Sequence, residues 1–264
     1  DQVESRLSNV VQTESDQTHK ELLRKAIALR DIGNYDEAID LLLNQANQSP
    51  SDPDIPSALS HCYILKDNLE QAIIHLEQAK NINPEIASIG WNQTRLFLKQ
   101  NKVTEALAIA EGTIKLFPND VEGLGILGSC LRVNGNLDES LKYLNEAIEL
   151  NPNYAEAIIN RGLIYLNKKD KINALTDLEK AYRIKPHIKE IWDLLIGLVV
   201  ESKNYSRAIS FLIKMIEFDP SYEKSVTLLV SCTQEADDPS LAIMSLKKVL
   251  EVRPDDAVIF LNLG

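Results

Sequence analysis

The chain has 264 residues and a formal net charge of −11. This excess of negative charge disfavours nucleic acid as a partner, because phosphate neutralisation needs clustered lysine and arginine, and it favours basic or zwitterionic protein partners. No apolar run approaches the about 20 residues that cross a bilayer, so membrane insertion is not expected.

Residues 1–18 stand apart from the rest of the chain. Val3, Leu7, Val10 and Val11 share one helical face within this segment. We expect a short capping helix or tail over residues 1–18, because the ends of repeat arrays need covering. A dimerisation helix is the alternative, but the apolar stripe is short for that purpose.

From His19 onward the sequence repeats at a constant interval. Prolines stand at 50, 84, 118, 152, 186, 220 and 254. When each unit is numbered so that its proline takes place 32, seven repeats and a truncated eighth result: 19–52, 53–86, 87–120, 121–154, 155–188, 189–222, 223–256 and 257–264. Proline lacks a backbone N–H and pushes the preceding residue out of the α region, so each repeat is predicted to end its second helix just before it.

Each repeat has the pattern of two short amphipathic helices. In repeat four, apolar side chains recur every three or four positions from Val121 to Leu131 and again from Leu137 to Ile148. The Asn-Gly-Asn sequence at 134–136 lies between them and tolerates the left-handed backbone that ends one helix before the next. The sequence therefore predicts a tandem array of helix pairs.

Three repeats depart from this pattern. In repeat two, Pro53 and Pro56 fit only the first turn of a helix. In repeat three, Gly90 replaces the large residue of place 4, and Trp91 lies one position late. Repeat seven turns at residues 237–239 and stays in register.

The second helices share a small residue at place 20 and a large one at place 24. Place 20 is Ala or Ser in all seven repeats, and place 24 is Leu in six of them. Together with Leu127-Gly128 at places 7 and 8 and Tyr63, Phe97 and Tyr165 at place 11, this pattern resembles the tetratricopeptide repeat (TPR) family over residues 19–264. The resemblance implies an all-α, right-handed superhelical TPR solenoid of antiparallel helix pairs that acts as a protein-binding scaffold.

No catalytic, cofactor or metal site is expected. Gly123, Gly125 and Gly128 spell the dinucleotide-binding pattern GxGxxG, but a predicted helix stop precedes them where that motif needs a strand. The four histidines are scattered over repeats one, two and five, without the spacing of a metal-binding motif. Cys62, Cys130 and Cys232 all occupy place 10, where we expect small core residues, and three buried thiols favour a reducing compartment such as the cytoplasm.

The TPR resemblance implies that the first helices line a concave groove, with places 2, 5, 6, 9, 12 and 13 facing a bound segment. The candidate peptide-binding residues are Arg24, Arg30, His61, Trp91, Asn92, Arg95, Lys99, Arg132 and Asn160. The N-terminal part of this groove is therefore expected to be basic, and repeats five to seven, with Glu156, Glu190, Asp193, Glu201 and Glu235, to be acidic. We expect an acidic group or free carboxylate of the peptide near Arg95 and Lys99. Trp91 is either an apolar anchor for the ligand or a core residue.

Two specialised TPR functions can be compared by place. The carboxylate clamp of chaperone-binding TPR proteins needs Lys at place 5, which no repeat has, and the asparagine ladder of sugar-transferring arrays at place 6 is limited to Asn92 and Asn160. We therefore expect a scaffold that binds a peptide or extended protein segment. The alternative is a substrate-selecting region of a larger enzyme, glycosyltransferase- or sulfotransferase-like, since the chain has no initiating Met and ends within a predicted helix. The oligomeric state and the partner are not predicted.

Overall fold

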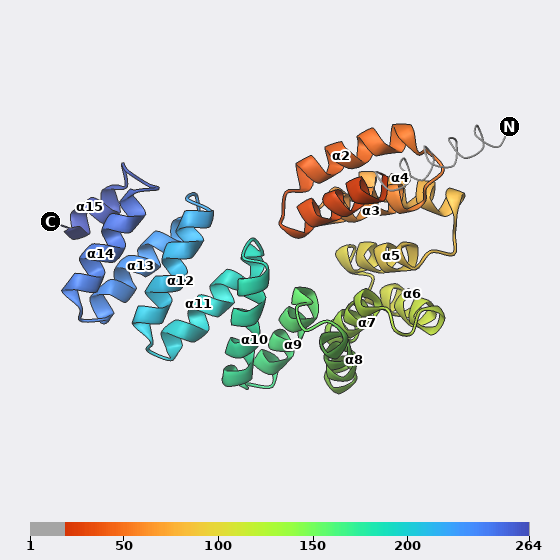
Figure 1. Cartoon of the computed structure of the whole chain (residues 1–264). Helices are drawn as coiled ribbons and strands as arrows, with labels where there is room; N and C mark the ends of the chain where they lie inside the picture. Colours follow the sequence, from red (N-terminus) through yellow and green to blue (C-terminus); the bar gives the residue numbers. More distant parts are fainter. Residues whose placement is uncertain (1–18, 264) are drawn as a thin grey trace, which may run out of the picture. The chain divides into compact units, whose positions relative to one another are not determined.

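The computed structural model describes residues 19–263, and every regular element in that range is helical (Figure 1). The predicted capping helix or tail over residues 1–18 lies outside this range. The first helix covers residues 19–31. The others are α2 (Tyr35–Gln48), α3 (Asp54–Leu65), α4 (Leu69–Ile82), α5 (Ala87–Lys99), α6 (Val103–Leu116), α7 (Val121–Val133), α8 (Leu137–Leu150), α9 (Ala155–Asn167), α10 (Lys171–Ile184), the 3₁₀ turn η1 (Lys189–Ile191), α11 (Trp192–Glu201), α12 (Tyr205–Phe218), α13 (Glu223–Glu235), α14 (Pro239–Leu250) and α15 (Ala257–Leu263).

The chain divides into two compact units, residues 1–157 and 158–264, which we call the N-unit and the C-unit. Within each unit a helix packs mainly against its neighbours in the sequence, as α3 does against α4 and α12 does against α13. First helices of successive repeats also touch, since α3 packs against α5 and α5 against α7. Packing between near neighbours alone is typical of a solenoid, and the predicted all-α fold class is confirmed.

The small and large residues of the second helices form the core of the helix pairs. Ala38, Ala72, Ala106, Ser140, Ala174 and Ala208 of place 20 are buried, as are Leu42, Leu76, Ala110, Leu144, Leu178, Leu212 and Leu246 of place 24. A small side chain where two helices cross lets their backbones approach closely, and the large residue one turn later fills the space beside the crossing. Gly128 of α7 has the same role, because a Cβ there would collide with Leu144 of α8.

The turn between the two helices of each repeat has one conformation, which recurs at the same place of every repeat. The backbone angle φ is positive at Gly33, Asp67, Asn101, Gly135, Lys169, Lys203 and Asp237. In most of these turns, the residue that follows the positive-φ position donates its N–H to the carbonyl oxygen five positions before it. Asn68, for example, donates to Tyr63 at 2.9 Å. This bond satisfies a carbonyl at the helix end. Only two of the seven positions are glycine, so the chain holds this left-handed turn even where the sequence does not favour it.

The glycines of the GxGxxG pattern lie inside α7 and serve helix packing. A Cβ at Gly123 would meet the ring of Trp91, and one at Gly125 would meet the ring of Tyr154. The residues before α7 form a turn and a cap, in which Asp120 accepts a hydrogen bond from the N–H of Gly123 at 2.9 Å. These glycines follow a turn where the motif needs a strand, so the dinucleotide pattern is a chance match.

The three cysteines are free and buried, as place 10 predicted. Burial raises the pKa of Cys62 to about 11 and that of Cys130 to about 12. Because the thiolate is the reactive form, both thiols stay protonated and unreactive up to about pH 9. We expect native protein at pH 8 to react with Ellman's reagent at least 100-fold more slowly than protein in 6 M urea. Fast, complete labelling of the native chain would contradict this burial.

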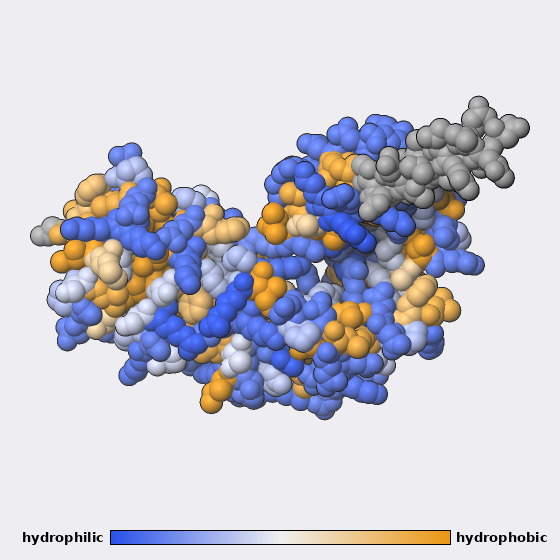
Figure 2. All heavy atoms as spheres, viewed as in Figure 1, coloured by the Kyte–Doolittle hydropathy of each residue, from blue (hydrophilic) through white to orange (hydrophobic). Residues whose placement is uncertain are grey.

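On the face seen in Figure 2, hydrophilic side chains predominate and hydrophobic ones show between them. Several large apolar residues are well exposed, among them Leu116 on α6 and Ile172 on α10. Single exposed apolar side chains are ordinary on a protein surface and indicate nothing by themselves. A functional surface must therefore be sought where side chains of one kind act together.

Candidate peptide-binding surface

The candidate surface is formed by the first helices of the N-unit. The helix of residues 19–31, α3, α5 and α7 follow one another, and we call the side chains that they present at places 2, 5, 6, 9, 12 and 13 the first-helix face. Most of the predicted groove residues belong to it. The structure brings several of them into direct contact across repeat boundaries.

A network of charges joins first helices from consecutive repeats. Nη1 of Arg30 lies 2.9 Å from Nδ1 of His61, and His61 Nδ1 lies 4.0 Å from Oε1 of Glu122. Arg95 donates a hydrogen bond from Nη2 to the same Glu122 oxygen. Arg95 and His61 therefore lie beside one carboxylate supplied by repeat four, and Arg30 of repeat one joins the network through His61.

Electrostatics favour the ionised forms of Glu122 and Arg30 in this network. Burial acts to raise the pKa of Glu122, but the guanidinium groups of Arg95 and Arg30 outweigh it and lower that pKa below its ordinary value. Arg30 is also paired with Asp31, whose Oδ1 lies 2.8 Å from Nη2. Burial acts to lower the pKa of Arg30, and Asp31 more than compensates, so its pKa is raised. Glu122 keeps 41% of its side chain exposed, so solvent and ligands can reach the network.

Asn92 was predicted to line the open groove, and this prediction is wrong because the side chain is buried. Its side chain is buried and donates to the carbonyl oxygen of Ser57 at 2.8 Å and to Oγ of Ser57 at 3.1 Å. Its amide oxygen accepts a hydrogen bond from Nη1 of Arg95 at 3.2 Å. Asn92 therefore binds α5 to α3 and orients Arg95, because its donors and acceptor are used within the protein.

Trp91 is likewise a core residue, and its alternative role as a ligand anchor is wrong. The side chain is 1% exposed, packs against Gly123, and donates from Nε1 to Oδ2 of Asp120 at 3.3 Å. The one-position shift from place 4 has a steric cause. Thr113 fills the space beside Gly90, and Gly123 of the next repeat leaves room for the indole ring.

The other candidates are more accessible. Lys99 donates to Oδ1 of Asp67 at 3.1 Å, and Arg24 is exposed on the first helix. Arg132 is half-buried, and burial lowers its pKa. Asn160 is half-buried on α9 and belongs to the C-unit, so the structure does not join it to the N-unit residues.

The acidic members of the surface were not predicted from the sequence. Glu122 occupies place 2 and Asp31 occupies place 13, both among the places assigned to the groove. Their places therefore pointed to the groove, but none of the residues predicted there in the N-terminal repeats was acidic. Asp67 lies at the left-handed turn, outside the places assigned to the groove, so its place in the repeat did not indicate a role. The first-helix face of the N-unit is consequently a mixed surface of paired charges.

Fold and surface together define a tandem helical-repeat protein whose exposed first helices carry charged and polar side chains. Sequence profiles described as tetratricopeptide repeat match residues 29–88, 92–155 and 155–188. The chain belongs to the tetratricopeptide repeat family.

Similar proteins cover a range of sizes. Hsp70-Hsp90 organizing protein 3 of Arabidopsis thaliana is 28% identical over 141 residues, which are 53% of this chain and 25% of that protein. A UDP-N-acetylglucosamine–peptide N-acetylglucosaminyltransferase of Giardia intestinalis is 28% identical over 127 residues, 43% of this chain and 8% of that protein. The matches therefore span a quarter or less of these two relatives.

Solved structures support the fold. A thermophilic tetratricopeptide repeat protein of Thermus thermophilus superposes with a TM-score of 0.57 at 22% identity, covering 69% of this chain and all of that one. A chain of the APC/C hetero-tetramer Cut9-Hcn1 superposes with a TM-score of 0.62 at 17% identity, covering 90% of this chain and 47% of that one.

Membrane spans and metal clusters are both absent from the described part of the chain. Between residues 19 and 263, no helix is long and apolar enough to cross a membrane. The same range contains no group of three or more His, Cys, Asp or Glu side chains arranged to hold a metal ion.

Proposed function

We propose that this chain is a protein-interaction scaffold that binds an extended peptide or protein segment along the first-helix face, with no catalysis of its own. The observation that carries the proposal is the charge network of Arg30, His61, Arg95 and Glu122, which joins four consecutive repeats. A ligand that runs across several repeats would meet a prearranged row of charged groups. The organizing proteins among the relatives support the same class of function.

The proposed ligand carries an acidic group that reaches Arg95 and Lys99. Arg95 already contacts Glu122, and Lys99 already contacts Asp67, so a ligand carboxylate must share or displace these partners. Charge-assisted hydrogen bonds to a guanidinium are worth about 1.5–3 kcal/mol when partly buried. Because Glu122 and Asp67 already bind these cations, the net free energy gained on ligand binding is smaller. A weakly charged ligand would not displace them.

The test of this proposal replaces Arg95 and Lys99 together. The binding partner is first identified by cross-linking capture from the source lysate, and its affinity is then measured by calorimetry. We expect R95A/K99A to weaken binding at least 10-fold, because two charge-assisted contacts are lost. The control K115A/K142A removes the same charge from exposed lysines of second helices and should change affinity less than two-fold. Unchanged affinity in a folded R95A/K99A protein would refute the proposal.

The specialised chaperone clamp is not part of the proposal. Place 5 of the first helices is Leu23, Ser57, Trp91 and Gly125 in the N-unit, without the Lys that the clamp needs. The similarity to Hsp70-Hsp90 organizing proteins therefore supports the repeat architecture and a scaffold role. It does not assign a chaperone as the ligand.

A second candidate function places the array in a larger enzyme as its substrate-selecting region. The observation that favours it is the match to the Giardia N-acetylglucosaminyltransferase. The test isolates the full-length protein from its source and measures transfer of labelled N-acetylglucosamine from the UDP sugar to acceptor peptides. Transfer that is lost when the array is deleted would support this candidate, and a full-length protein without transfer activity would exclude it.

We also infer a reducing compartment, such as the cytoplasm, for the native protein. Three free, buried cysteines support this placement, because thiols persist where glutathione and thioredoxin keep them reduced. Cell fractionation followed by immunodetection tests it.

A further inference from the structure

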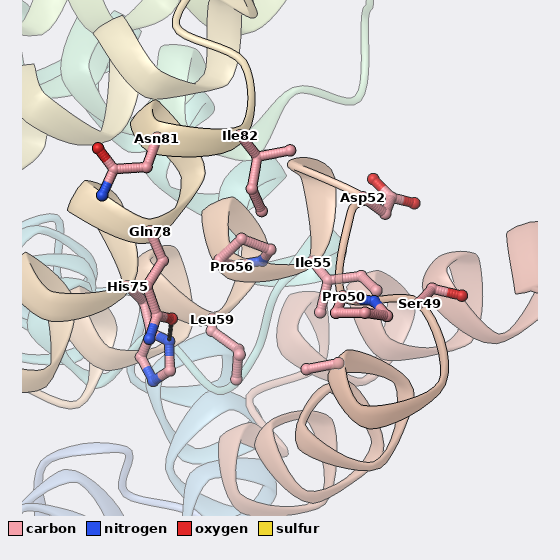
Figure 3. A pocket seen from close by; sticks show the side chains of 11 residues that line it. Ser49, Pro50, Asp52, Ile55, Pro56, Leu59, His75, Gln78, Asn81 and Ile82 are labelled. Carbon is pink, nitrogen blue, oxygen red and sulfur yellow. Dashed lines mark hydrogen bonds between the residues drawn. The ribbon is translucent and has the colours of Figure 1, made fainter.

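The N-unit has a pocket of about 380 Å³ on its second-helix side, apart from the first-helix face (Figure 3). Its floor is Ile55, Pro56 and Leu59 of α3. One wall comes from the end of α2 and the turn after it, including Ala46. The opposite wall comes from the last two turns of α4, including Ile82. Ile55 and Leu59 are almost fully buried, so a ligand side chain would contact mainly the two walls, and the pocket volume is enough for one large side chain.

Exposed apolar side chains continue the two walls along the helices. Leu43 precedes Ala46 by three positions on α2 and is 39% exposed. Ile74 precedes Gln78 by four positions on α4, shares its helical face, and is 43% exposed. Each wall of the pocket therefore has one further exposed apolar side chain near it, which a chain docked in the pocket could also cover.

The segment that forms this pocket has an excess of acidic residues. The segment 35–85 contains nine Asp and Glu residues and only two lysines. Each lysine is already paired, Lys66 with Asp36 and Lys80 with Glu77. Asp67 pairs with Lys99 of α5, and the Asp52 carboxylate lies 2.6 Å from Nε2 of His19. The segment still keeps an excess of negative charge.

The pocket lining contains one carboxylate, that of Asp52, and two helix C-termini lie beside it. Both α2 and α4 end there, and a helix C-terminus carries negative partial charge. The last turn of α2 has no basic residue to offset it. Asp52 lines the pocket, and Asp54 follows it at the start of α3. Burial raises the pKa of Asp54, and the nearby Asp52 adds a smaller contribution in the same direction.

From this combination we propose that the α2–α4 pocket docks a basic amphipathic segment of a partner protein, with one large apolar side chain in the pocket and flanking Lys or Arg side chains on the acidic rim. The apolar anchor is bound by burial, and the basic residues are selected by charge complementarity. This site is independent of peptide binding on the first-helix face. It would allow the scaffold to hold two partners of opposite charge at once.

The test uses a defined probe. A short fluorescein-labelled peptide of leucine and lysine, patterned as an amphipathic helix, is titrated against the protein and compared with a peptide in which glutamate replaces every lysine. We expect the basic peptide to bind at least 10-fold more tightly than the acidic one. Its binding should shift the methyl NMR signals of Ile55, Leu59 and Ile82. Equal affinity for the two peptides, or shifts confined to the first-helix face, would overturn the proposal.

Variants of the pocket separate specific docking from general attraction to an acidic protein. A46F fills the pocket and should weaken binding at least 10-fold, whereas N47F adds an aromatic ring at the next position, which is exposed and outside the lining, and should change affinity less than two-fold. If A46F does not fold, I82S removes the apolar wall at a partly exposed position and should weaken binding about five-fold. A folded pocket variant with wild-type affinity would rule out the site.

Sedimentation velocity distinguishes a basic partner from a second copy of the chain. We expect A46F to leave the sedimentation coefficient of the protein unchanged, because the pocket is proposed to receive a different protein. Self-association of the wild-type chain that disappears in A46F would overturn the basic partner, since a second copy would then fill the pocket.

Discussion

The Trp91→Ala variant is expected to lower the free energy of unfolding of the N-unit by about 3–5 kcal/mol, the usual cost of truncating a fully buried Trp. The indole ring is 1% exposed and belongs to a core with Ala106, Leu127 and Cys130. Its removal leaves a cavity between repeats three and four that the glycine at position 123 cannot fill. It also leaves Asp120 without the donated N–H.

The two tryptophans make this experiment selective. Trp91 lies in the N-unit and Trp192 in the C-unit, so the tryptophan fluorescence of W91A reports only the C-unit, while circular dichroism reports both. We expect urea unfolding of W91A, followed by circular dichroism, to start at lower denaturant, with the fluorescence transition unchanged. The control W91F keeps an aromatic ring and should cost about half as much. A W91A protein with wild-type unfolding would show that the indole is not part of the core.

The Arg161→Ala variant is expected to destabilise the C-unit by about 3–5 kcal/mol, the usual cost of removing one partner of a buried ion pair. Arg161 of α9 donates to both carboxylate oxygens of Asp177 on α10, each at 2.8 Å. The Asp177 side chain is only 5% exposed. Hydrogen bonding to Asp177 raises the pKa of Arg161, so the guanidinium stays charged at neutral pH. Loss of the guanidinium leaves a buried carboxylate without its main partner.

A double substitution tests that explanation. R161M/D177L replaces the pair by apolar side chains of similar length, and such replacements of buried ion pairs are often neutral. We therefore expect the double variant to recover most of the stability lost in R161A. The readout is the midpoint of urea unfolding followed by tryptophan fluorescence in proteins that also carry W91F, so that Trp192 is the remaining tryptophan. A double variant as unstable as R161A would show that the pair does not carry the effect. Gly162 supports the geometry, because a Cβ there would lie 3.3 Å from the Cβ of Asp177.

The architecture was predictable because its determinants are local. Apolar spacing of three and four positions specifies a helix, and a proline specifies where it stops, whatever surrounds it. Small residues such as Ala38 and Ala72 recur at a fixed place, so the crossing of the two helices in each repeat could also be predicted. The helices that form the candidate surface could also be predicted, because the place of a residue within the repeat determines the helix face on which it lies.

By itself, then, the sequence determined the helix pairs, their period, the buried cysteines and the family. The tertiary structure alone decided which candidate residues are open to a ligand. Trp91 is buried because Gly123 of the next repeat leaves space for its ring, and Asn92 is buried because Ser57 of the preceding repeat satisfies its amide. The pairing of Arg95 with Glu122 likewise depends on two repeats packing together. A repeat pattern specifies which residue types occur at each place. The contacts between repeats depend instead on the combined shapes of side chains that are distant in the sequence, and the pattern of a single repeat does not specify these.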